Sequence, residues 1–292
     1  MAKRMSIGDR VFEVIVTAIV LFLGFVCLYP LIYVFSCSIS NPTAFMQGKV
    51  KLFPVGFSFE SYMMVLRAQA IWTYYYNTVW YTVVGTICNI LATILLAYPL
   101  SKRYFVLRGP ITVLIIITMF FGGGLIPTFI MINNLGLYGS RWVMVLLGLV
   151  STYNTIIART FFMSLPEELF ESARIEGASE FKVLWKIVAP LSKPILAVLT
   201  LYYGVGHWNT YLSALIYLPS SDLHPIQVLL RRVVLQNSRD ILESADIDPD
   251  AQIASNQVKY AAIFFTMVPI MCLYPFLQKY FVKGVMIGAL KG

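Results

Sequence analysis

Residues 164–194 read SLPEELFESARIEGASEFKVLWKIVAPLSKP, a polar segment that lies between two apolar runs. Each run has roughly the twenty residues that a helix needs to cross a bilayer. The segment itself alternates apolar and charged residues at helical spacing, which predicts two short amphipathic helices joined at Gly177. We therefore expect it to lie outside the bilayer, as a docking element rather than a plain connector.

The composition indicates that the rest of the chain is embedded in a membrane. Of its 292 residues, 59% are hydrophobic and only 12% are charged, and the mean hydropathy is +0.75. Six stretches are long and apolar enough to span a bilayer, at about 11–35, 72–98, 110–132, 142–162, 194–217 and 260–281. We expect an all-α membrane protein with six transmembrane helices, forming one domain over residues 1–292.

The third of these stretches contains residues that weaken a helix. Gly122, Gly123 and Gly124 are followed closely by Pro127. We expect this span to be bent or broken. Such a break can line a substrate path, or the glycines can let neighbouring helices approach closely, and the sequence leaves both readings open.

The distribution of Lys and Arg predicts the orientation. With the N-terminus inside the cell, most of the 22 Lys and Arg residues fall on the cytoplasmic side, whereas the others are spread over longer outer loops. We expect both termini and the 164–194 loop in the cytoplasm and the 218–259 loop outside. The net charge of +8 then follows from topology, and no aromatic-basic motif supports a nucleic-acid partner.

Ionisable residues are nearly absent from the interiors of the expected spans. His207 is the one clear titratable candidate, because Glu13, Arg159 and Lys279 lie near span ends. A self-contained secondary carrier normally places carboxylates at mid-depth, so a carrier of that kind is disfavoured. A channel or a purely structural membrane scaffold would also fit this composition.

No motif in the chain predicts catalysis. A phosphate-binding G-x-x-x-x-G-K-[ST] loop, a His-Glu-x-x-His metal pair and a G-x-S-x-G nucleophile turn are all missing from the sequence. We expect that the chain neither hydrolyses ATP nor catalyses covalent chemistry itself, and that it binds no cofactor or metal. Energy for active transport would have to enter through a partner.

The 164–194 loop carries signals for the ends of its two helices. Ser164 and Glu167 have the spacing of a capping box, which predicts a helix beginning there and ending at Gly177. After the glycine, apolar residues recur at helical spacing until Pro190 and Pro194 interrupt the pattern. A helix of this kind can lie in a groove of another protein or rest on lipid, and amphipathicity alone does not separate these readings.

Several residues of the loop resemble the EAA loop of ABC-importer permeases, whose pattern is Glu-Ala-Ala, three residues, Gly, and then spaced apolar residues and prolines. The matching residues are Glu171, Ser172, Ala173, Glu176, Gly177, Ala178, Phe181, Ile187, Pro190 and Pro194. Ser172 replaces the first alanine of the pattern, and Glu176 stands where the family usually has Asp. Neither departure removes the acidic residue or the glycine.

The resemblance covers nearly the whole chain. MFFGGGLIPTFIMINNLGL at 119–137, the Trp208–Asn209 pair and QKYFVKGVMIGALKG at 278–292 are similar to carbohydrate-importer permeases of the MalG type, and within these to the LplC/YtcP-like branch. In this family the EAA loop docks in a cleft of the ATPase subunit. The resemblance implies a coupling role for Glu171, Ala173, Glu176, Gly177, Ala178 and Phe181.

The resemblance also implies partners and a location. These are a second, related permease subunit in a heterodimer, two ABC ATPase subunits that use ATP and Mg, an extracytoplasmic solute-binding protein, membrane lipid and a carbohydrate substrate, all at a bacterial cytoplasmic (inner) membrane. The substrate expected for this branch is an oligosaccharide or a polysaccharide fragment. The tail from Lys283 to Gly292 either reaches toward the ATPase or is solvated.

A candidate substrate path lies in the fifth expected span. Its residues are His207, Trp208, Asn209 and Tyr211, which offer the aromatic faces and hydrogen-bonding groups that often hold sugars. The competing reading is structural, because Trp and Tyr also form interfacial belts and the Trp208–Asn209 pair could serve a helix contact. In the 218–259 loop, Arg231, Arg232, Arg239 and a set of acidic residues are either solvated or contribute to docking of the binding protein.

Overall fold

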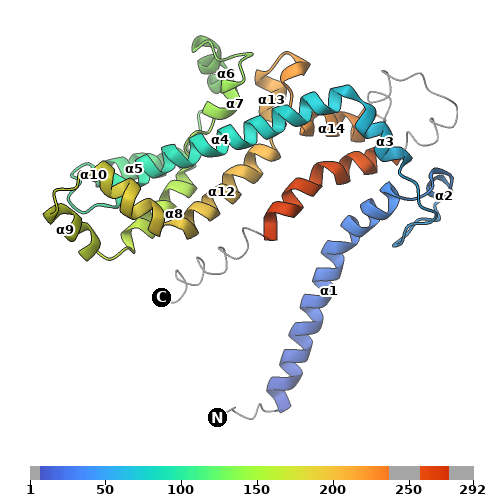
Figure 1. Cartoon of the computed structure of the whole chain (residues 1–292), viewed down its shortest axis with the longest axis horizontal. Coiled ribbons are helices and arrows are strands. Elements are labelled where there is room, and N and C mark those ends of the chain that lie inside the picture. The colour runs from blue at the N-terminus through green and yellow to red at the C-terminus, as the bar shows by residue number, and fades with distance from the viewer. Residues whose placement is uncertain (1–6, 237–256, 276–292) are drawn as a thin grey trace. The chain divides into compact units, whose positions relative to one another are not determined.

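The computed structural model describes residues 7–236 and 257–275, and within these ranges the regular secondary structure is helical, apart from one isolated bridge between Ser40 and Phe57 (Figure 1). The elements are α1 (Ile7–Ser38), α2 (Pro42–Met46), α3 (Glu60–Arg67), α4 (Gln69–Ser101), α5 (Arg108–Phe120), α6 (Leu125–Asn134), α7 (Trp142–Leu146), α8 (Thr152–Met163), α9 (Glu168–Ile175), α10 (Glu180–Val183), η1 (Leu184–Val188), α11 (Ala189–Leu191), α12 (Lys193–Trp208), α13 (Leu212–Tyr217), η2 (Ser221–Leu223), α14 (Ile226–Gln236) and a last helix, Gln257–Pro275. The all-α prediction is confirmed.

Three helices of the described residues are long and apolar enough to cross a membrane: α1, α4 and Gln257–Pro275. The number rises to five if two bent helix pairs each count as one span. The prediction of one continuous helix over 142–162 is wrong. This stretch forms α7 and α8, and between them Gly148 takes a φ of 79°, a backbone conformation that ends an α-helix.

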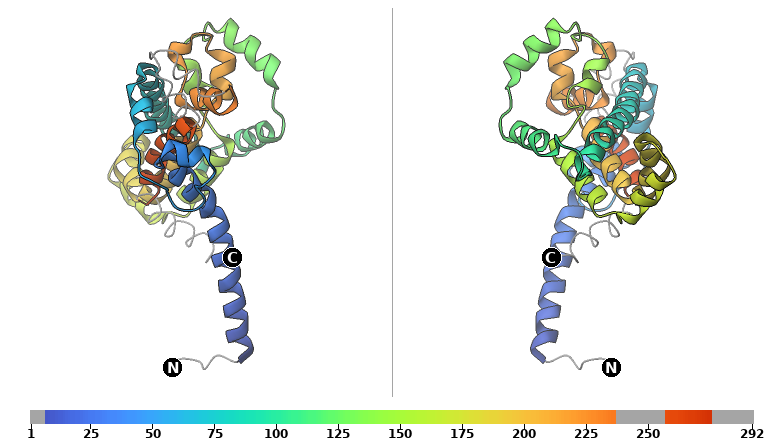
Figure 2. Two further views of the ribbon diagram at one scale, coloured as in Figure 1. Left: turned by 90° about the vertical axis from the view of Figure 1, so that its right-hand side faces the viewer. Right: turned by 90° about the vertical axis from the view of Figure 1, so that its left-hand side faces the viewer.

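The predicted break in the third span is confirmed. Helices α5 and α6 meet at an angle of 117°, and Figure 2 shows the chain turning sharply between these two green segments. The turn falls at Gly122–Gly124, where Gly124 has a φ of 80°. Side chains other than glycine rarely adopt this conformation, so the glycines permit the turn that the sequence suggested.

The chain forms two compact units, and the first consists of Met1–Ile71 together with Leu230–Val268. In this unit the apolar residues of α1 are exposed along most of the helix, as suits a segment facing lipid. The C-terminal end of α1 is tied to the last helix by the fully buried Gln257. Its Nε2 donates hydrogen bonds to the backbone oxygens of Cys37 and Ser40.

The second unit, Trp72–Leu229 with Pro269–Gly292, contains the candidate site. Its larger hydrophobic cluster joins α4, α8 and α12 to the loop helices α9 and α10. A smaller cluster, nearer the other end of α4, gathers Tyr81, Ile132, Val143 and Tyr217 with their neighbours. Helix α4 therefore runs alongside both clusters and links the 164–194 loop to the membrane part of the unit.

Candidate functional site

The 164–194 loop folds into two helical segments on either side of Gly177, as its sequence pattern predicts. Helix α9 ends at Ile175, and Gly177 takes a φ of 71° before Ser179 caps α10 by accepting a hydrogen bond from the Lys182 amide. The second segment continues from α10 through the π-helical turn η1 into α11. It then bends by 83° into α12.

The predicted capping box at Ser164 is wrong. Helix α9 begins at Glu168, and the residue before it, Glu167, makes no side-chain capping bond. Ser164 instead ends α8, and its hydroxyl donates a hydrogen bond to the Phe161 carbonyl at 2.7 Å. The S-x-x-E spacing is present, but the serine is already used by the preceding helix, which the pattern alone cannot reveal.

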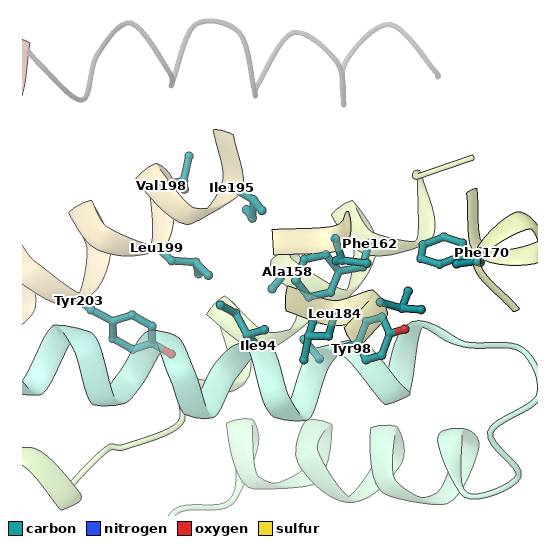
Figure 3. Close-up of a cluster of buried hydrophobic side chains, with 14 residues drawn as sticks. Ile94, Tyr98, Ala158, Phe162, Phe170, Leu184, Ile195, Val198, Leu199 and Tyr203 are labelled. Atoms are coloured by element: carbon teal, nitrogen blue, oxygen red, sulfur yellow. The ribbon is translucent and has the colours of Figure 1, made fainter. Parts of the chain in front are cut away.

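The loop has a buried face and an exposed face. Its buried face consists of Phe170, Ala173, Val183, Leu184 and Val188, which pack with residues of α4, α8 and α12 (Figure 3). Of the predicted coupling residues, Ala173 therefore lies inside and Ala178 is half-buried, whereas Glu171, Glu176, Gly177 and Phe181 are exposed. Ile175 is also exposed, at 88% of its surface. The outer face thus combines carboxylates with apolar side chains that nothing covers within the described chain.

The loop is hydrogen-bonded to the end of α4. Tyr98 donates from its hydroxyl to Glu180 Oε2 at 2.6 Å, and Arg174 Nε lies 3.7 Å from Glu180 Oε1. Next to them, Arg159 Nε donates to the Leu100 carbonyl at 2.9 Å and satisfies one of the last backbone acceptors of α4. The Tyr98–Glu180 bond thus attaches the loop to α4, and the Arg159–Leu100 bond attaches the neighbouring helix α8 to the same end of α4.

His207 lies at the centre of a second polar network. Asn89 on α4 donates both protons of its amide nitrogen, to the carbonyls of Gly148 at 3.0 Å and Leu149 at 2.7 Å. Its Oδ1 is therefore left as an acceptor, 2.6 Å from His207 Nε2. Because Oδ1 can only accept, His207 carries a proton on Nε2, and a neutral imidazole offers Nδ1 as its acceptor.

A cavity of about 350 Å³ opens beside this network. Most of its lining residues are polar, and they come from α4, α7, the α7–α8 break, α8, α12 and α13 with the residues between the last two. They are Asn89, Met144, Leu147, Gly148, Ser151, Asn154, Tyr202, Tyr203, Gly206, His207, Thr210 and Ser213. Hydroxyl, amide and imidazole groups of this kind can exchange hydrogen bonds with the hydroxyls of a sugar. The size lies within the range of small-molecule pockets.

The four residues of the predicted substrate path separate in the structure. His207 lines the cavity, whereas Trp208 is 5% exposed and packs edge-on against Tyr75 at 5.7 Å between ring centroids. Asn209 follows the end of α12 and is exposed, and so is Tyr211, which precedes α13. Asn89, Ser151 and Asn154 were missed, and the signal that could have found Asn89 and Asn154 is an amide inside an apolar run.

Only some of the residues predicted to contact a binding protein or an ATPase through the 218–259 loop and the C-terminal tail lie within the described ranges. Arg231 and Arg232 lie on α14, whereas Arg239, the acidic residues that follow it and the 283–292 tail lie outside the described residues. In the described ranges, no group of three or more His, Cys, Asp or Glu side chains is arranged to hold a metal ion.

Comparison with known proteins places the chain in a family. Residues 89–287 match the model of "Binding-protein-dependent transport system inner membrane component". The polygalacturonan/rhamnogalacturonan transport system permease protein YtcP of Bacillus subtilis is 35% identical, over 97% of this chain and 99% of that protein. Protein LplC of the same organism is 36% identical, over 98% of this chain and 96% of that protein.

A solved structure agrees with these relatives. A chain of a bacterial ABC transporter involved in the import of the acidic polysaccharide alginate superposes with a TM-score of 0.87 and 32% identity, over 96% of this chain and all of that one. The resemblance to carbohydrate-importer permeases is confirmed. The chain belongs to the family of binding-protein-dependent transport system inner membrane components.

Proposed function

We propose that this chain is a transmembrane permease subunit of an ATP-driven importer for a carbohydrate, with an oligosaccharide or a polysaccharide fragment as substrate. It works beside a second, related permease, with two ATPase subunits inside the membrane and a solute-binding protein outside. The chain crosses the bilayer six times as one domain, and both termini are cytoplasmic. Family membership supports this proposal, as do the transport functions by which the relatives are named.

The observation that carries the proposal is the exposed face of the 164–194 loop. Glu171, Glu176, Ile175 and Phe181 lie on it, while the opposite face is buried in the hydrophobic cluster. An exposed face of this composition, held on a firmly packed support, is suited to lie against another protein. We assign the docking of an ATPase to the exposed residues Glu171, Glu176, Gly177 and Phe181. The buried Ala173 and the half-buried Ala178 are proposed to take part in coupling by supporting this face from inside.

We assign sugar contact to the cavity beside His207. Its lining offers donors and acceptors from five chain segments, and the Asn89 network holds His207 in one orientation. The remaining residues of the predicted path are Trp208, Asn209 and Tyr211. They are proposed to belong to the substrate path, and the Trp208–Asn209 pair could instead serve as a gate or a helix contact. In the cycle, ATP binding to the partner subunits favours one conformation of the permease pair, and hydrolysis releases it.

The test is purification of the tagged chain from its native membrane in mild detergent, with mass spectrometry of the retained proteins and an ATPase assay. We expect a second permease and an ATPase to be retained. Glu171→Lys reverses a charge on the docking face and should reduce retention of the ATPase, whereas Glu60→Lys, an exposed change on α3, should not.

The rival function is a self-contained carrier or channel. Recovery of this chain alone, together with transport after reconstitution without any ATPase, would support that rival and overturn the proposal. Equal ATPase retention by Glu171→Lys and the unaltered chain would remove the assignment of the docking face while leaving the importer class in place.

A further inference from the structure

Lys102 is a buried lysine directly after the end of α4, on the loop side of the membrane part. Only 8% of its surface is exposed, and within the described residues no carboxylate lies within ion-pair distance of its ammonium. A buried ammonium without a carboxylate in direct contact is costly, because more distant carboxylates compensate only in part for the loss of water. Methionine would fill a similar volume without this cost. Packing alone therefore does not account for the charge.

The ammonium of Lys102 is held by aromatic rings from two elements. Its Nζ lies 2.8 Å from the centroid of Phe170, on α9, and 4.8 Å from the centroid of Tyr98, on α4. Both rings are buried. A cation over a ring face in a site shielded from water is attracted more strongly than at a surface. This contact therefore fixes the face of Phe170, and with it the position of α9 against the end of α4.

The second helix of the loop is tied to the same end of α4. Tyr98 bonds Glu180 at the start of α10, and Glu180 lies beside Arg174 of α9. The guanidinium of Arg174 in turn lies 4.4 Å from the ring centroid of Tyr104, two residues beyond Lys102. Residues 98–104 therefore contact both arms of the loop, on either side of the Gly177 turn. A displacement of either α9 or α10 is therefore transmitted to a side chain at or just beyond the end of α4.

We propose that Lys102 is a positioning residue of the transport cycle: its contact with Phe170, together with the Tyr98–Glu180 bond, makes α9, α10 and the end of α4 move as one body. This inference rests on the proposed docking of an ATPase at the loop. Displacement of the loop then shifts α4 and, through Asn89 on the same helix, the wall of the His207 cavity. Without the ammonium, α9 keeps its apolar packing but can shift relative to α4, and α4 stays in place.

The experiment measures this transmission directly and needs no sugar. The experiment uses the whole importer. All native cysteines of this chain are replaced, and the substitution Ser213→Cys places one reporter thiol in the cavity wall. The rate of labelling by a small water-soluble thiol reagent is compared with and without ATP and vanadate, and ATP hydrolysis is measured on the same sample. Four variants are compared with the unaltered chain: Lys102→Met, Lys102→Arg, Phe170→Leu and, as a matched control, Arg103→Met, which removes an exposed charge one residue away.

We expect Lys102→Met and Phe170→Leu each to reduce the nucleotide-dependent change in labelling roughly fivefold or more, with ATPase retention and hydrolysis maintained. A fifth variant, which combines Lys102→Met with Phe170→Leu, should be no worse than the worse of these two single variants, because both changes remove the same contact. Lys102→Arg keeps the cation and should keep most of the response, and Arg103→Met should behave as the unaltered chain.

The outcomes distinguish a failure of the proposed function from a failure of the role assigned to Lys102. If the unaltered importer shows no response to ATP and vanadate, or retains no ATPase, the proposed function fails. If the unaltered importer responds and Lys102→Met responds equally, the role of Lys102 fails and the proposed function stands. If Lys102→Met does not assemble, Phe170→Leu decides, since leucine keeps an apolar side chain in the cluster and removes only the ring, and a full response from this variant overturns the inference.

Discussion

At the scale of single residues, the orientation of one amide determines the chemistry of the cavity. Asn89 uses both donors of its side chain on the carbonyls of Gly148 and Leu149, which leaves only an acceptor for His207. The imidazole therefore has a defined tautomer when neutral. A sugar hydroxyl that meets its free nitrogen has to donate rather than accept, which limits the arrangements of substrate that fit.

Gly85 provides the space for this imidazole. A Cβ at Gly85 would lie 2.5 Å from Nε2 of His207, so Gly85→Ala must displace the ring and break its bond to Asn89. We expect a loss of about 1–3 kcal/mol in stability, measured as a lower melting temperature of the purified complex. Gly204→Ala is the control, because its Cβ would meet Thr86 Oγ1 at an ordinary 3.7 Å. Equal melting temperatures for the two variants would contradict the prediction.

Lys102 makes the stability of the protein depend on pH. Burial lowers the pKa of Lys102 to about 8 from its usual 10.5, and nearby Glu180 opposes this only in part. Between these two pH values the unfolded chain binds more protons than the folded chain, so the free energy of unfolding rises with pH, by up to about 1.4 kcal/mol per pH unit. The added stability is complete above the unfolded pKa and is lost as the pH falls through 8.

Thermal melts between pH 7 and pH 9.5 check this prediction, with Lys102→Met as the comparison. The methionine variant lacks the lysine contribution, so we expect its stability advantage over the unaltered chain to shrink as the pH rises. A pH slope that is the same in both proteins would show that the Lys102 ammonium is not shielded from water.

At the scale of elements, the turn between α9 and α10 depends on Gly177. Its φ of 71° lies in the left-handed region, where a Cβ costs about 1–2 kcal/mol. We expect Gly177→Ala to lower the stability of the loop by that amount and to weaken ATPase retention. The measurement is the ATPase concentration needed for half-maximal recovery of the complex. Gly109→Ala, near the start of α5 and with open space around it, should leave this concentration unchanged.

The sequence predicted the elements better than their ends and contacts. Long apolar runs are a local property, so α1 and α4 and the broken span at Gly122–Gly124 could be recognised directly. Ser164 was misassigned because the same residue can end one helix or begin the next, and only tertiary structure decides. The 142–162 stretch was read as one helix, because a single Gly148 in an apolar run carries too weak a signal.

The candidate site was predictable only where residues lie close in sequence. Local pattern drew attention to Gly177 and the amphipathic helices around it, the resemblance to the EAA loop gave them a role, and His207 was selected for its rarity in the spans. The partners of His207 and Glu180 were not found, since Asn89 and Tyr98 lie far from them in the chain, at separations of 118 and 82 residues. Hydropathy reports depth in the membrane, but it does not report which faces of two helices meet.

At the scale of the whole molecule, the proposed orientation is open to a direct test. In a chain without its native cysteines, we expect Arg103→Cys and Ser164→Cys to resist a membrane-impermeant maleimide in intact cells and to react after the membrane is permeabilised. Asp222→Cys, in η2 at the start of the outer loop, should react in both conditions. Labelling of Ser164→Cys in intact cells would place the 164–194 loop outside and remove its assignment to an ATPase.

The break between α7 and α8 has a consequence for how the chain is made. Two short helices joined by non-helical backbone insert poorly into lipid, because lipid offers no water to form hydrogen bonds with the carbonyls of Gly148 and Leu149. Asn89, which accommodates both carbonyls, lies on α4 and is synthesised earlier. Helix α4 is therefore already in the membrane when residues 147–151 are synthesised. We expect Asn89→Leu to cause a defect in biogenesis before any defect in transport, because residues 142–163 would stay outside the bilayer and the chain would be degraded.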